Sequence, residues 1–126
     1  MKFSLEIIKI SQVVSDNIDY NTLIFKVEIN KKINIDNSRE LWIFLTTLID
    51  GGVQKIIMEM KNLEYIDSSG IGVIINAVKL LRAKKGDIVL SSVSSEIKEL
   101  FKVINLQNFV KMYNNDAEAL NTFRYV

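Results

Sequence analysis

The sequence contains no histidine, no cysteine and no proline. Without cysteine, the chain has no disulfide, no thiolate metal ligand and no cysteine nucleophile. Without histidine, it lacks the commonest general base, the serine–histidine–aspartate triad and every histidine-ligated metal centre. Lysine or aspartate bases and carboxylate sites for Mg²⁺ or Ca²⁺ remain open, but the sequence has no convergent carboxylate motif. We therefore expect a protein that is not an enzyme and uses no cofactor or metal.

Long apolar runs and an excess of one charge are also absent. No apolar stretch approaches the roughly 20 residues that span a bilayer. Residues 1–12 alternate polar and apolar side chains, unlike a signal peptide. Sixteen basic and fifteen acidic residues give a net charge of +1, which argues against nucleic acid or an anionic membrane as the partner. We expect a cytoplasmic protein without membrane insertion.

The composition is that of an ordinary globular protein. The 126 residues are 48% hydrophobic and 25% charged, which allows one compact domain over residues 1–126. No linker, repeat or low-complexity segment divides the chain. The oligomeric state is not marked in the sequence.

Apolar residues follow a period of two in some segments and a helical period in others. Alternation over residues 3–7 and 23–29 predicts two strands, which should be neighbours because no helix separates them. The polar residues 15–20 between them predict a turn, and residues 62–66 are interpreted as a loop. The remaining patterns predict strands at 54–60, 88–90 and 109–113, and helices around 37–50, 71–82, 97–104 and 116–123.

Strands that alternate with helices, after an opening pair of strands, predict the α/β fold class. We expect a mixed, mostly parallel sheet of four to five strands with about four helices packed on it. Asn37 is placed to cap the first helix, with Glu40 reaching back in a capping box. Asn115 or Asp116 is placed to cap the last helix.

One segment, residues 67–72, carries unusual chemistry. It places Asp67, Ser68, Ser69 and two glycines at the start of a predicted helix. Backbone N–H groups there have no intrahelical partner, so the site suits an anion, or a phosphate attached to one of its own serines. Alternatively, a polar side chain simply caps the helix and the glycines pack against the sheet. Neither a P-loop nor a nucleophile elbow is present.

Residues 65–74, Tyr-Ile-Asp-Ser-Ser-Gly-Ile-Gly-Val-Ile, resemble the signature of the STAS domain family (sulfate transporter and anti-sigma factor antagonist). The similarity is greatest to the stand-alone bacterial anti-sigma factor antagonists and extends over residues 55–60, 80–86 and 115–120. The family often has a glycine near the end of its second strand, where this chain has Asn30-Lys31-Lys32.

The resemblance implies a partner switch regulated at Ser68. In the family, the serine directly after the aspartate is phosphorylated by a partner that is both an anti-sigma factor and a serine kinase, of the ATP-binding, histidine-kinase-like type. The unphosphorylated protein binds this kinase and frees its client, the phosphorylated protein lets go, and a serine phosphatase resets it. The expected partner-binding residues are Asp67, Ser68, Ser69, Gly70, Ile71, Gly72 and Val73. The alternative is a constitutive STAS subunit of a transport or signalling assembly, without a phosphorylation switch.

The helix that follows the segment carries a second apolar stripe, formed by Val73, Ala77 and Leu80. Two interpretations are open. The stripe is either part of the docking surface or packs against a neighbouring helix of the same domain. Trp42 lies outside the apolar stripe of its own helix and is expected to be partly exposed.

Overall fold

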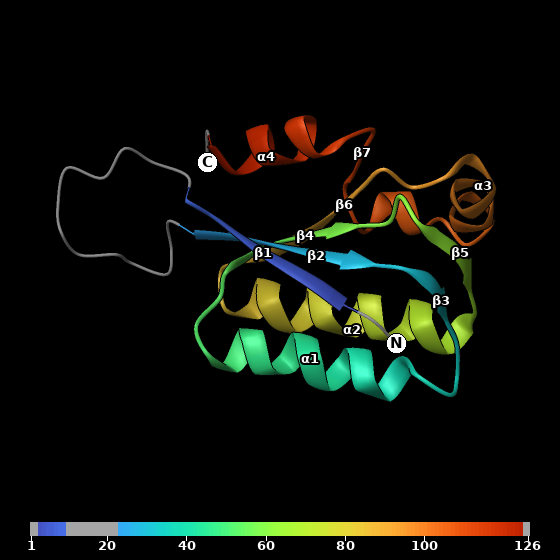
Figure 1. The fold of residues 1–126 in the computed structure, drawn as a ribbon, viewed down its shortest axis with the longest axis horizontal. Helices are drawn as coiled ribbons and strands as arrows, with labels where there is room; N and C mark the ends of the chain where they lie inside the picture. Colours follow the sequence, from blue (N-terminus) through green and yellow to red (C-terminus); the bar gives the residue numbers. More distant parts are fainter. Residues whose placement is uncertain (1–2, 10–22, 125–126) are drawn as a thin grey trace, which may run out of the picture.

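The computed structural model describes residues 3–9 and 23–124 (Figure 1). The predicted turn over residues 15–20 lies outside the described residues. In chain order the elements are β1 (Phe3–Lys9), β2 (Leu23–Ile29), β3 (Lys31–Ile33), α1 (Ser38–Asp50), β4 (Lys55–Glu59), β5 (Leu63–Ile66), α2 (Ser68–Ala83), β6 (Asp87–Ser91), α3 (Ser95–Val103), the 3₁₀ turn η2 (Leu106–Asn108), β7 (Met112–Tyr113) and α4 (Asp116–Arg124).

Within the described residues, five strands form the main sheet in the order β1-β2-β4-β6-β7. β1 runs antiparallel to β2, as the absence of a helix between them predicts. The other neighbouring strands are parallel, and a helix lies on each connection between them, as parallel pairing requires. The predicted α/β fold, with a mixed and mostly parallel sheet and four helices, is confirmed.

Helices cover both faces of the sheet. α1 and α2 lie side by side on one face, and α4 lies over the other (Figure 1). The larger core lies under α1 and α2 and includes Val27, Leu45, Ile56 and Ile74, which are fully buried. A smaller core under α4 consists of Ile24, Ile57, Val89, Ala119 and Phe123. Removal of these apolar side chains from water is the main force that holds the layers together.

A row of polar side chains fixes the start of α4 to the sheet. Lys26 Nζ donates to Asp116 Oδ2 at 3.1 Å and lies 3.7 Å from Glu59 Oε2. The fully buried Ser91 donates its hydroxyl to Asp116 Oδ1 at 2.6 Å. Burial raises the pKa of Glu59, the charge of Asp116 raises it further, and Lys26 acts against both. Lys26 therefore holds two carboxylates together where they would otherwise repel each other.

The structure differs from the sequence-based prediction at β3 and β5. The predicted loop over residues 62–66 contains β5, which pairs in parallel with β3 to form a separate two-stranded sheet. β3 follows β2 after Asn30, and β5 follows β4 after three residues, so this small sheet prolongs the β2–β4 pair. Strands of three and four residues are too short to show a period of two, which is why the pattern did not reveal them.

Two helix starts give opposite outcomes for the predicted caps. Asn37 makes no side-chain capping bond to α1, so that prediction is wrong. Its amide instead accepts from the Asn34 N–H at 2.9 Å and donates to the Lys32 carbonyl at 3.0 Å, which closes the loop after β3. At α4 the Asn115 side chain accepts from the Glu118 N–H at 2.9 Å, which confirms Asn115 as a cap.

The segment before α4 is less regular than predicted. The expected strand over residues 109–113 is reduced to Met112–Tyr113, and the turn η2 precedes it. Asn105 takes a left-handed backbone conformation with φ +57°, which redirects the chain after α3. Leu106 and Val110 are buried there, so the apolar residues of this segment serve the larger core.

Candidate functional site

The candidate site is built where the small β3–β5 sheet meets the start of α2. β5 carries the chain to Asp67, whose backbone N–H donates to the Ile33 carbonyl of β3 at 3.1 Å. Asp67 remains extended, with φ −103° and ψ −176°, and α2 begins at the next residue. The β3–β5 pairing therefore fixes both the position and the direction from which the chain enters α2.

The Asp67 carboxylate accepts four hydrogen bonds that fix the start of α2. Oδ1 accepts from the N–H groups of Ser69 and Gly70 at 3.0 and 3.1 Å, which caps α2. The same oxygen accepts from the Ser69 hydroxyl at 2.5 Å. Oδ2 accepts from the Ile35 N–H at 3.0 Å and so joins α2 to the loop after β3. The sequence-based option that Asp67 caps the helix is confirmed.

These contacts lower the pKa of Asp67. The hydrogen bond from the Ser69 hydroxyl is the largest cause, and the N–H groups of Gly70, Ile35 and Ser69 act in the same direction. Partial removal from water acts against them. Each donor stabilises the ionised form, so Asp67 is a carboxylate at neutral pH.

The two serines of the segment have different surroundings. The Ser69 hydroxyl is held by Asp67, and its residue is half-buried. Ser68 is exposed at the first position of α2, and its hydroxyl has no hydrogen-bond partner within the described part of the chain. The hydroxyl of Ser68 is thus the one of the two that an approaching enzyme reaches without breaking an existing bond.

The two glycines also differ from each other. A Cβ atom at Gly70 would lie 2.6 Å from Ile33 Cγ2 and 2.8 Å from Ile66 Cγ1, and both of those side chains are buried. Gly70 is therefore required by packing against the small sheet. A Cβ atom at Gly72 would meet nothing within 4 Å. Packing thus explains Gly70, whereas Gly72 leaves open space beside the first turn of α2.

The remaining predicted residues lie along α2. Ile71 and Val73 are half-buried and pack against the edge of the larger core. Of the second apolar stripe, Ala77 is fully buried and Leu80 is partly buried on the same core. This stripe therefore packs within the domain, as one of the two interpretations has it. Trp42 of α1 is partly buried, as predicted.

Two exposed apolar side chains border the segment and were not identified from the sequence. Ile35, whose N–H binds Asp67, is 77% exposed, and Tyr65 of β5 is 53% exposed. The only signal for Ile35 is an isolated apolar residue within a polar loop. They are two of the six large apolar side chains that are exposed among the described residues, and both lie beside the Asp67–Gly72 segment.

Lys31 lies in the Asn30-Lys31-Lys32 stretch, where the resemblance leads us to expect a glycine near the end of the second strand. Its backbone is left-handed, with φ +67°, and the strand register shifts between Lys31 and Lys32. The backbone at Lys31 therefore has a conformation that glycine adopts more easily than lysine. Such a conformation is unfavourable for a residue with a side chain.

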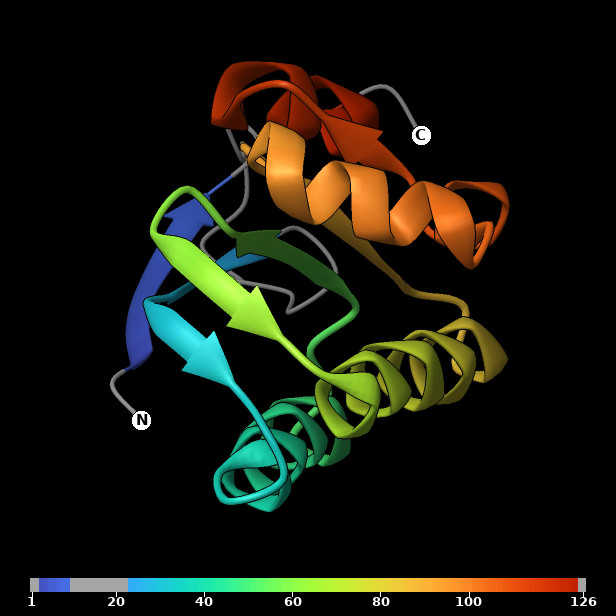
Figure 2. The same cartoon turned by 90° about the vertical axis from the view of Figure 1, so that its right-hand side faces the viewer.

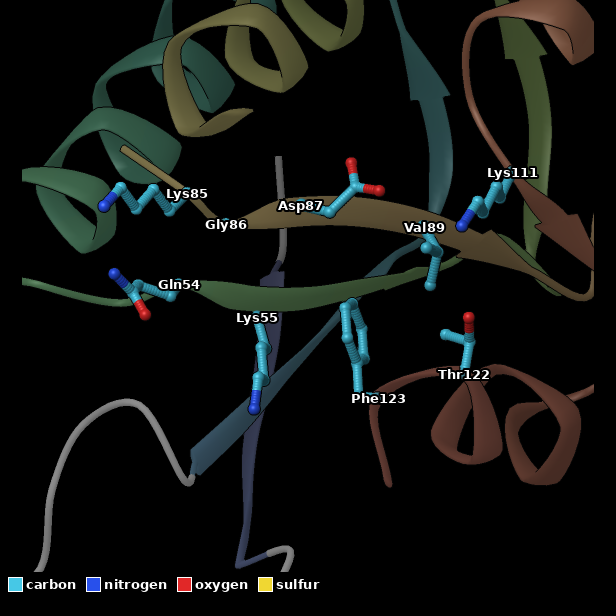
Figure 3. A pocket seen from close by; sticks show the side chains of 9 residues that line it. All are labelled: Gln54, Lys55, Lys85, Gly86, Asp87, Val89, Lys111, Thr122 and Phe123. Carbon is cyan, nitrogen blue, oxygen red and sulfur yellow. The ribbon is translucent and has the colours of Figure 1, made fainter. Parts of the chain in front are cut away.

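A separate small cavity lies at the opposite end of the main sheet, between the starts of β4 and β6 and the end of α4 (Figure 3). Val89 and Phe123 contribute its apolar atoms, and Lys55, Lys85 and Lys111 stand around it. None of residues 67–73 lines this cavity. The candidate site is instead an open surface around Ser68.

Comparisons with known proteins agree with this fold. The sequence profile of the STAS domain matches residues 10–119. A Thermotoga maritima protein named as an anti-sigma factor antagonist is 31% identical over 97 residues, which cover 75% of this chain and 85% of that protein. A Thermotoga maritima crystal structure with the same description has a TM-score of 0.77 at 27% identity, covering 80% of this chain and 87% of the other. Unphosphorylated SpoIIAA has the same fold, with a TM-score of 0.70 at 20% identity over 99% of this chain and all of its own.

The structure is thus a small α/β domain in which Asp67 caps α2 and Ser68, Ser69 and Gly70 form its first turn. The chain belongs to the STAS domain family. Its relatives include proteins named anti-sigma factor antagonists in Thermotoga maritima, Paenibacillus polymyxa and Staphylococcus aureus. In the part of the chain that the structure describes, each helix is too short or too polar to cross a membrane.

Proposed function

We propose that this chain is an anti-sigma factor antagonist that acts as a partner switch in the cytoplasm. The unphosphorylated form binds an anti-sigma factor that is also a serine kinase of the ATP-binding, histidine-kinase-like type, and so frees the client of that kinase. Phosphorylation of Ser68 ends the binding, and a serine phosphatase restores it. The binding surface consists of residues 67–73 and the exposed side chains beside them.

The contrast between the two serines carries this proposal. Ser68 presents a free, exposed hydroxyl at the start of α2, whereas the Ser69 hydroxyl is bound to Asp67 at 2.5 Å. A kinase can phosphorylate the Ser68 hydroxyl while the hydrogen bonds by which Asp67 caps α2 stay in place. Phosphorylation of Ser69 would remove one of the donors that hold Asp67 in place.

The cap also explains why a phosphate would change binding and leave the fold intact. A phosphate on Ser68 adds about −1.5 to −2 charges at neutral pH. The N–H groups of Ser69 and Gly70 already bind Asp67, so the phosphate remains at the surface and faces the partner. A partner carboxylate ~5 Å away is repelled by roughly 3 kcal/mol per unit charge at an effective dielectric constant of about 20. A tenfold loss of affinity needs only about 1.4 kcal/mol.

Relatives support the same role. Proteins named anti-sigma factor antagonists match most of the chain, and one from Thermotoga maritima is 31% identical. The Bacillus protein SpoIIAA, a relative in fold, is known in both a phosphorylated and an unphosphorylated form. A fold that holds its shape in both states is what a partner switch requires.

The experiment compares Ser68→Ala, Ser68→Asp and the matched control Ser69→Ala. Each variant is used as bait in cells of the source bacterium, and retained proteins are identified by mass spectrometry. We expect wild type, Ser68→Ala and Ser69→Ala to retain a protein with an ATP-binding kinase domain, and Ser68→Asp to lose it. With ATP, the purified kinase should add one phosphate to wild type and to Ser69→Ala, and none to Ser68→Ala.

A different outcome would point to the alternative role. If both Ser68 variants retain the same partner equally well, the chain is a constitutive STAS subunit and the switch does not exist. Phosphorylation that persists in Ser68→Ala would place the acceptor elsewhere in the chain.

A further inference from the structure

The small sheet formed by β3 and β5 presents an exposed outer face directly before Ser68. We refer to residues 31–33 and 61–66 as the β3–β5 ribbon. In its register Lys32 lies opposite Tyr65, and Ile33 lies opposite Ile66, whose chain continues into Asp67 and Ser68. Figure 2 shows the two strands side by side at the start of α2. Tyr65 is more than half exposed on this ribbon, which suits an anchor for a partner.

The exposed charges of the ribbon are mainly positive. Lys31, Lys32 and Lys61 are exposed, against the single exposed carboxylate of Glu64. These lysines form no ion pair within the described residues. The three lysines and Glu64 give the ribbon itself a net charge of +2, compared with +1 for the whole chain. Uncompensated charge at a surface steers the approach of a partner with the opposite charge.

The backbone conformation of Lys31 provides a way to test the role of its side chain. Glycine would hold the left-handed conformation of this residue, with φ +67°, at no steric cost. A lysine there is conformationally unfavourable, and its exposed side chain makes no ion pair in the described part of the chain that would compensate. Lys85 has the same φ of +67° at the far end of α2, which provides a matched control.

We propose that the β3–β5 ribbon is the electrostatic part of the docking surface, and that the partner presents acidic side chains to it around an apolar pocket for Tyr65. This inference rests on the proposed function and specifies the chemistry of the partner. An acidic partner surface makes the switch effective, because a phosphate on Ser68 repels it.

The test uses the kinase partner identified with the unphosphorylated chain, purified and titrated calorimetrically at 50 and 300 mM salt. Lys31→Gly removes one charge and relieves the unfavourable backbone, and Lys85→Gly makes the same two changes away from Ser68. We expect Lys31→Gly to fold at least as stably as wild type and to bind two- to fivefold more weakly at 50 mM salt. Lys85→Gly should bind like wild type. Lys32→Glu should weaken binding at least tenfold at 50 mM salt and reduce its salt dependence.

The outcomes separate this inference from the proposed function. If Ser68 phosphorylation releases the partner but Lys31→Gly, Lys32→Glu and Lys85→Gly all bind like wild type, the function stands and the acidic-partner inference is wrong. Tighter binding of Lys32→Glu would indicate a basic partner surface and would also overturn the inference. If no partner binds the unphosphorylated chain, the proposed function itself fails, and with it the basis of the inference.

Discussion

The glycines of α2 give a matched pair of substitutions that tests the geometry of the site. Alanine is favoured over glycine within a helix by about 1 kcal/mol, so each substitution gains a similar amount from the helix itself. Only Gly70→Ala adds a Cβ atom that lies 2.6 Å from Ile33 Cγ2 and 2.8 Å from Ile66 Cγ1. Both neighbours are buried on the small sheet and cannot swing away.

Overpacking of this kind costs about 1–3 kcal/mol. Because the helix gain is common to both variants, the difference between them isolates the packing cost. Gly72→Ala should therefore be about 0.5–1 kcal/mol more stable than wild type, and Gly70→Ala should be about 1–3 kcal/mol less stable than Gly72→Ala. For a chain of this length, 1 kcal/mol corresponds to roughly 3–5 °C in Tm.

Urea denaturation followed by circular dichroism measures both free energies of unfolding. The reasoning is refuted if the two variants are equally stable, since Gly70 would then have the same free space as Gly72. Partner binding adds a second readout for Gly72. If its open space serves access by the partner, Gly72→Ala should bind more weakly than wild type despite its higher stability.

Three further predictions concern charged groups. Asp67→Asn should lower the Tm at pH 7. Since the pKa of Asp67 is lowered on folding, its stabilisation is present above the unfolded value of about 3.9, and the difference from wild type should shrink as thermal scans move below about pH 4. Lys26→Met should lose about 1–3 kcal/mol at pH 7, because Glu59 and Asp116 then face each other without Lys26. Glu59→Gln should be as stable as wild type or more stable at pH 7. Its advantage should grow as the pH rises above about 4.3, because the folded state disfavours ionisation of Glu59; an advantage that grows toward low pH would contradict this.

The main elements of the fold follow from sequence patterns because they bury long apolar stripes. α1 and α2 repeat their apolar residues at a helical spacing, and β2, β4 and β6 carry apolar residues over enough positions to be recognised as strands. β3 and β5 could not be recognised, because strands of three and four residues are stabilised by pairing with each other across a gap in sequence. Asn37 has the right residue type for a cap, but its amide closes the neighbouring loop instead.

In the candidate site, too, some features are visible in the sequence, whereas others depend on contacts between distant segments. The Asp67–Gly72 segment is visible in the sequence as a motif, and Asp67 caps α2 as one sequence-based option has it. The sequence does not distinguish the exposed Ser68 hydroxyl from the bound Ser69 hydroxyl on physical grounds. It also does not reveal that Ile33 and Ile35 meet the segment, because those contacts depend on the unrecognised β3–β5 pairing.

The most direct test of the central claim is a phosphosite map of this protein isolated from its native cells, in growing and in stressed cultures. The partner bound to each fraction is quantified alongside. We predict a single phosphate on Ser68 whose occupancy changes with condition, and partner bound only to the unphosphorylated fraction. Absence of phosphate from Ser68 in every condition, or equal partner binding by both fractions, would contradict the account.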